Sequence, residues 1–442
     1  MAFLGTLPAD MAGKLYEACD AARQNGDDSL PFDLICDALQ PAEPDLSEHI
    51  LFGPAAPLVT EDAGAPAAGA ILKSSLEPFE AFARSAAGAI VSDLESGARS
   101  RIAGRGVLGA ALVEVFDAKM EDQEGRNAFI KTFGGERGAA DARKMITLLC
   151  AEPELSENLY DLPDYIKDID DDMLAALRAC HEAVVAKEPR AELLLMFLLM
   201  ERLDQHWMIL RVAKVISNKQ DDLLFSRTEF SVIGEMLLDE AAEAVRRLQL
   251  DSRTAVEPDK VIGALDGFAA ITQGMTRELG IRKDGEWGKR LHKIRHDAAS
   301  NMEDMCRETP DAIDKALPLR RVKLDGNIPA NRPDTSRKPK PEIAERAVAL
   351  CDVLRRCRSH ANAAAFASAR VRMFEEAEKR LDDYSASLID VIHEAGAEEM
   401  QNLKPWIALT GRAILALSGE DSHAVFQRRA SAAAGKSSQD AA

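Results

Sequence analysis

Two histidines and an aspartate lie close together near residue 295 and form the clearest candidate metal site of the sequence. His292 and His296 are four residues apart, so both imidazoles project from one face if the segment is helical. Asp297 follows directly and would add a carboxylate. Imidazole nitrogens together with carboxylates hold the divalent ions that activate water in metal-dependent hydrolases. This chemistry defines one hypothesis for the chain.

The residues around the two histidines oppose that hypothesis. Four cations surround them, and their positive charge would repel a metal ion: Lys289, Arg290, Lys293 and Arg295. The remaining ligands would have to come from other helices, and no further pattern in the sequence singles them out. A basic helix face is therefore the preferred interpretation, and the hydrolase stays as the alternative.

A glycine-rich segment matches the spacing of a dinucleotide-binding turn. It reads Gly104-Arg105-Gly106-Val107-Leu108-Gly109, and a helical pattern follows it. Such a turn needs a parallel strand before the glycines and a strand-containing unit after them, and neither pattern is visible. We therefore predict a glycine-rich turn between two helices and no cofactor.

Helical patterns dominate the elements that would position these residues. Apolar residues recur at steps of three and four through nearly every ordered stretch, and alternating strand-like runs are almost absent. Hydrophobic residues make up 46% of the 442 residues, which is enough for substantial cores. We predict an all-α fold without a sheet, as an irregular multi-helix bundle with a separate, coiled-coil-like C-terminal helical hairpin.

Shifts in composition divide the chain into helical segments and linkers. Proline, alanine and glycine are concentrated before the main bundle, and prolines with basic residues precede the C-terminal helices. The predicted parts are a helical pair in 1–40, a flexible linker in 41–70, the main bundle in 71–317, a basic linker in 318–341, the hairpin with a third helix in 342–420, and a disordered tail in 421–442.

An apolar stripe is the strongest single pattern of the C-terminal part. Its members alternate at steps of three and four, as in a seam packed against another helix. One uninterrupted helix over 342–395 would reach about 80 Å, so we expect a turn near 359–365 and two helices whose stripes face each other. The seam predicted to bind a partner consists of Phe374, Leu381, Tyr384, Leu388 and Val391.

A basic stretch crosses the predicted linker in front of this hairpin. Its prolines deny it a helix, and a plain linker is the preferred interpretation. Its cations could nevertheless contact an anionic surface or partner. The residues concerned are Arg320, Arg321, Lys323, Arg337, Lys338 and Lys340.

Charge and segment lengths restrict the location and partners of the chain. The net charge of −19 argues against a general nucleic-acid binder. The first residues lack the basic and apolar regions of a signal peptide, and the longest apolar run, 193–200, is too short to cross a bilayer. Seven scattered cysteines are typical of reduced thiols. We expect a cytoplasmic protein without a transmembrane segment.

The leading functional hypothesis is a non-enzymatic interaction protein, such as an adaptor, a scaffold or a regulatory subunit. Long amphipathic helices offer grooves and seams to other helices, so the partner would be another protein or a second copy of the chain. The C-terminal helices are the expected interaction surface.

Overall fold

Helix starts follow local signals in the sequence. The side chain of Asp170 accepts a 2.8 Å hydrogen bond from the N–H of Met173 and caps α7 (Asp171–Lys187). Proline stands at the start of α12 (Pro258–Glu278) and of α14 (Pro341–Arg356), where a missing N–H removes no helical hydrogen bond. Each of these three starts therefore follows from residues within its own first turn.

The computed structural model describes residue 19 and residues 46–62, 69–217, 225, 227–249, 255–324 and 328–440, without the side chains of 323–330, 397 and 436–440. The helical pair predicted in 1–40 lies outside these residues, apart from Cys19. Fourteen α-helices are present in the described part, so the chain is mostly helical, as predicted.

The chain forms two compact units. Unit 1 contains the described residues up to Ile166 together with Asp170–Arg202. Unit 2 contains Lys167–Ile169 and the described residues from Leu203 onward. The chain therefore passes between the units three times, and the last passage falls inside the bundle that we expected in 71–317.

Unit 1 consists of short elements followed by six helices. Its two short strands pair in parallel, with Val59 opposite Ile71. The elements are η2 (Leu46–Glu48), η3 (Gly53–Leu58), β1 (Val59–Thr60), β2 (Ile71–Leu72), η4 (Lys73–Ser75), α3 (Leu76–Glu95), α4 (Arg101–Glu121), α5 (Arg126–Thr132), α6 (Glu136–Asn158), α7, η5 (Pro189–Ala191) and α8 (Glu192–Met200).

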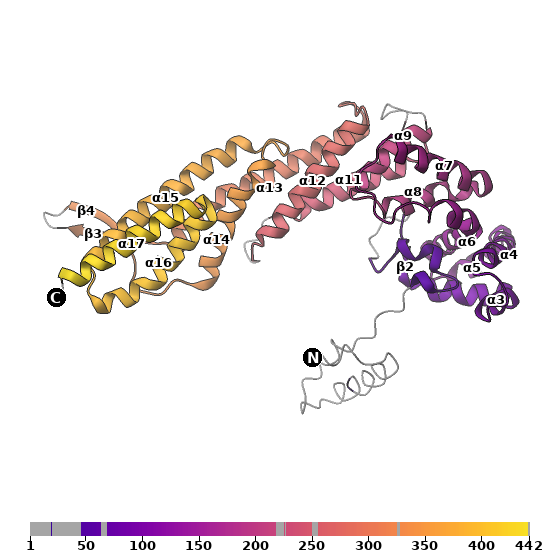
Figure 1. Ribbon diagram of the computed structural model, residues 1–442, viewed down its shortest axis with the longest axis horizontal. Coiled ribbons are helices and arrows are strands. Elements are labelled where there is room, and N and C mark those ends of the chain that lie inside the picture. Colours follow the sequence, from indigo (N-terminus) through magenta and orange to yellow (C-terminus); the bar gives the residue numbers. More distant parts are fainter. Residues whose placement is uncertain are drawn as a thin grey trace. The chain divides into compact units, whose positions relative to one another are not determined.

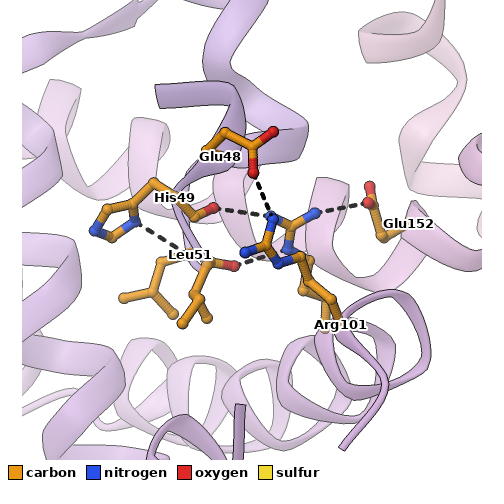
Figure 2. Close-up of polar contacts among 7 residues, drawn as sticks. Glu48, His49, Leu51, Arg101 and Glu152 are labelled. Carbon is orange, nitrogen blue, oxygen red and sulfur yellow. Dashed lines mark hydrogen bonds and ion pairs between the residues drawn. The ribbon is translucent and has the colours of Figure 1, made fainter. Parts of the chain in front are cut away.

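The segment 46–58, here named the strap, packs against α4 and α6. Leu51 and Phe52 are buried, and the Arg105 guanidinium donates to the carbonyl oxygens of His49 and Ile50, each at 2.8 Å. Figure 2 shows Glu48, His49 and Leu51 of the strap beside Arg101 and Glu152. The flexible linker expected in 41–70 is thus replaced, over 46–62, by structure that its apolar residues and these hydrogen bonds stabilise.

Unit 2 contains the long helices of the chain. Its central helix, α13 (Glu286–Ala316), contacts α11, α14 and α15, and Figure 1 shows the later helices side by side. The elements, besides α12 and α14, are η6 (His206–Met208), α9 (Ile209–Ser217), α11 (Ser231–Arg246), α13, β3 (Leu319–Leu324), β4 (Ile328–Pro333), η7 (Cys357–Ser359), α15 (Ala367–Glu394), α16 (Ala397–Ser418) and α17 (Glu420–Asp440).

The C-terminal helices pack differently from the expected two-helix pair. The chain does turn between Arg356 and Ala367, with Ala365 in the left-handed region at a φ of 59°. However, α14 packs mainly on α13 and α16, and α15 mainly on α13 and α17. The apolar stripes of α14 and α15 thus meet several helices, with α13 packed on both of them.

Two further expectations are corrected here. Residues 319–333, expected as a linker, contain an antiparallel pair of strands, so the strand-free prediction fails at this pair and at β1–β2. Residues 420–440, expected as a disordered tail, form α17, because Phe426, Ala430 and Ala433 are buried as this helix packs on α15 and α16. Within the described residues, no helix combines the length and apolarity that crossing a bilayer requires.

Candidate functional site

A groove runs beside α14 in unit 2. Its volume is about 1450 Å³. One side is formed by α13, the other by α16, and residues near the starts of α12 and α17 also line it. Pockets for small ligands measure roughly 300–1,000 Å³, so this groove, named the α14 groove, offers room for a larger occupant.

The α14 groove has an apolar strip. Ile343, Val348 and Ala349 of α14 are half-buried along it. Across from them, Leu415 of α16 is 39% exposed, although a leucine at the end of a packed helix usually faces a core. Apolar side chains that remain accessible in a concave surface mark a place where another molecule can exclude water.

Charged side chains on both sides connect the helices that form the groove. Arg346 of α14 binds Glu308 of α13 with two hydrogen bonds, of 2.7 and 3.2 Å. Arg412 of α16 pairs with Glu345 of α14, and this hydrogen bond lowers the pKa of Glu345. Such pairs at the rim fix the spacing of the helices and surround the apolar strip with charges of both signs.

The lining of the groove combines apolar side chains with charged ones. Among the described residues that line the groove there is no serine, threonine, cysteine, histidine or tyrosine. Its polar groups are the carboxylates, the lysine and the arginines along the rim. Hydrophobic contact with ionic complementarity at the rim is what this surface can provide.

The predicted seam on α15 lies mostly inside unit 2. Leu381 and Tyr384 are 2% exposed and Leu388 is fully buried, because α13, α16 and α17 pack around α15. Phe374 and Val391 are half-buried, and the guanidinium of Arg370 lies 5.2 Å from the ring centre of Phe374. The middle of the seam thus packs within the chain.

The residues predicted to bind a metal all lie on α13. His292 and His296 are exposed, and Asp297 is half-buried. Within the described part of the chain, no group of three or more histidine, cysteine, aspartate or glutamate side chains is arranged to hold a metal ion. Of the surrounding cations, Arg290 pairs with Glu235 and Asp239 of α11.

The glycine-rich segment 104–109 lies within α4 and is not a turn, which corrects the prediction. A Cβ on Gly109 would lie 2.6 Å from the backbone nitrogen of Cys150, and one on Gly106 would lie 3.0 Å from Pro153. The glycines therefore permit α4 and α6 to approach closely. Their spacing matches that of a nucleotide-binding turn because both structures need backbone surfaces without side chains.

The basic residues expected to contact anions lie on β3 and just after β4. The side chains of Arg320, Arg321, Arg337, Lys338 and Lys340 are all exposed. The backbone of Lys323 belongs to β3, while its side chain lies outside the described set.

Comparison of the chain with protein-family models, with curated proteins and with solved structures finds no match.

Proposed function

We propose that the chain is a non-enzymatic interaction protein, acting as an adaptor, scaffold or regulatory subunit, whose C-terminal module of residues 342–420 binds an amphipathic helix of a partner protein. The binding surface is the α14 groove. The single observation that carries the proposal is the accessible apolar strip of Val348, Ala349 and Leu415 inside a groove of about 1450 Å³.

The dimensions and chemistry of the groove support a helical occupant. The 16 residues of α14 extend about 24 Å at 1.5 Å per residue, which matches about four turns of a bound helix. A helix with an apolar stripe between acidic and basic residues would cover Val348 and Leu415 and meet the mixed charges of the rim. The alternative is a metal-dependent hydrolase that uses His292, His296 and Asp297; within the described residues no group of three or more possible ligands gathers to hold its metal ion.

The proposal is tested by placing a photo-crosslinking residue at position 348 of the full chain, and at Val371 in a control protein. Val371 is 49% exposed on α15 and does not line the groove. We expect crosslinks at 348, but not at 371, to one helical segment of a partner, which is then made as a synthetic peptide.

The peptide should bind the full chain, and Val348→Glu should weaken it at least tenfold because a charge would face the apolar stripe. Val371→Glu should leave its affinity unchanged. Equal crosslinking at both positions, crosslinks only to a second copy, or a peptide that ignores Val348→Glu would each refute the proposal.

A further inference from the structure

The β3–β4 pair is a small two-stranded sheet, and β4 is the strand that packs extensively on a helix. β4 packs on α15, where Arg332 binds both carboxylate oxygens of Glu394, at 2.5 and 2.8 Å. β3 pairs with β4 alone in the described part of the chain, with Arg320 opposite Arg332 and Arg321 opposite Asn331. β3 is therefore the outer strand.

One backbone hydrogen bond determines which groups of β3 face outward. The N–H of Asp334 donates to the carbonyl of Pro318 at 2.9 Å, just before the pair Leu319–Pro333. Hydrogen-bonded and non-hydrogen-bonded pairs alternate along an antiparallel ladder. The backbone N–H and C=O groups of residues 319, 321 and 323 consequently point away from β4.

The same alternation makes the two edges of this sheet unequal. On β4 the residues whose backbone groups point away from β3 are Pro329, Asn331 and Pro333. The two prolines among them have no N–H to donate. The opposite edge, on β3, keeps the N–H of each outward residue. Proline commonly blocks sheet edges against further pairing, so β4 is protected and β3 remains able to pair.

The exposed side chains around β3 are strongly basic. Arg320 and Arg321 lie on the strand, and Arg337, Lys338 and Lys340 follow the sheet. Hydrogen bonds from Ser336, with Arg320 and Arg337 nearby, lower the pKa of Asp334. Arg320 lies opposite Arg332, and the two positive charges repel each other. Because Arg332 already binds Glu394, an incoming carboxylate would pair with Arg320 and reduce this repulsion.

We propose that the outer edge of β3 binds an extended acidic segment of a partner protein, which adds to the sheet as a third strand. Backbone hydrogen bonds to residues 319 and 321 would hold the segment, and its carboxylates would meet Arg320 and Arg321. A second copy of β3 is a poor occupant, since it would place arginines of one copy beside those of the other. This surface is separate from the α14 groove.

The test uses the full chain and a labelled eight-residue peptide of repeated Glu-Glu-Val-Val, which presents carboxylates to both faces of the sheet, with binding measured by fluorescence anisotropy. A control peptide has proline in place of every valine, so it keeps the charge but cannot add to a strand. We expect binding of the first peptide only, weakening as salt is raised.

Two variants at one position separate charge from backbone pairing. Arg321→Ala removes the charge and should weaken binding about three- to tenfold. Arg321→Pro also removes the outward N–H while leaving the β3–β4 hydrogen bonds, and it should abolish binding with an unchanged circular dichroism spectrum. Equal binding of the proline peptide, equal binding of phosphatidylserine vesicles by wild type and Arg321→Pro, or salt-independent binding would overturn the proposal.

Discussion

The guanidinium of Arg105 donates a 2.8 Å hydrogen bond to the carboxylate of Glu152, and these side chains are only 5% and 2% exposed. Burial raises the pKa of Glu152, and the charge of Arg105 opposes this shift. Because Arg105 also binds two carbonyl groups of the strap, one side chain joins three segments of unit 1.

Replacing this arginine should therefore be costly. We expect Arg105→Met to lower the unfolding free energy of unit 1 by about 3–5 kcal/mol, since Glu152 would remain buried without its partner. The control is Arg101→Met, which removes a largely exposed pair with Glu48 and should cost less than about 1 kcal/mol. Hydrogen exchange of α4 and α6 amides measures both changes, and equal losses would contradict the prediction.

The strap should loosen in mild acid through His49. Burial lowers the pKa of His49, and its Nδ1 accepts a 3.2 Å hydrogen bond from the N–H of Leu51. The unfolded chain takes up a proton below about pH 6.5, before the folded chain does. Stability from this group is therefore complete above that pH and is lost as the pH falls toward the folded pKa.

An NMR titration should give His49 a pKa below 6.5. His49→Phe keeps a ring beside Phe52 and should reduce the pH dependence of unfolding between pH 5 and 7, by about 1.4 kcal/mol for each unit of pKa depression. A measured pKa of 6.5 or higher would show that the ring is not held neutral.

Two glycines of α12 should respond oppositely to alanine. A Cβ on Gly274 would lie 2.1 Å from the ring of Trp207, whereas one on Gly267 meets no atom within 4 Å. We expect Gly274→Ala to destabilise unit 2 by about 1–3 kcal/mol through overpacking, and Gly267→Ala to stabilise it by about 0.5–1 kcal/mol through helix propensity. Tryptophan fluorescence during urea unfolding measures both, and effects of the same sign would contradict the packing of Trp207.

The two ion pairs across the α14 groove should differ in strength. Side chains of the Arg346–Glu308 pair are 17% and 28% exposed, against 50% and 61% for Arg412–Glu345. Double-mutant cycles with alanine should give about 1 kcal/mol for the first pair, which is bidentate and partly buried, and about 0.2–0.5 kcal/mol for the second. A larger coupling in the exposed pair would argue against the packing of α13 on α14.

Local signals explain what could be predicted from the sequence. The cap at Asp170 and the prolines at 258 and 341 act within one helical turn, so the helix starts were accessible without knowledge of the fold. The strap was not accessible, because Arg105 lies 55 residues from Ile50, whose carbonyl it binds.

The site was harder to predict for a related reason. The α14 groove is built from surfaces of several helices, and half-buried residues such as Val348 continue the stripe of buried ones. The apolar periodicity is stronger around Tyr384 and Leu388, and both side chains are buried. Such periodicity predicts that a helix face is covered, but it does not tell whether another helix of the same chain or a partner protein covers it. The β3–β4 pair escaped prediction because its prolines, which exclude helix, are compatible with the outward positions of an edge strand.

Because the chain alternates between the two units, the units cannot be separated by a single cut in the sequence. A fragment that ends at Ile166 would lack α7 and α8, which belong to unit 1. A fragment that contains all of unit 1 must therefore extend through Arg202, and it then includes Lys167–Ile169, which belong to unit 2. The excised remainder would then lack the carbonyl of Ile169, to which Arg211 donates. Proteolytic cleavage within 167–169 should therefore leave the two fragments associated, because residues 170–202 of the C-terminal fragment pack with the rest of unit 1.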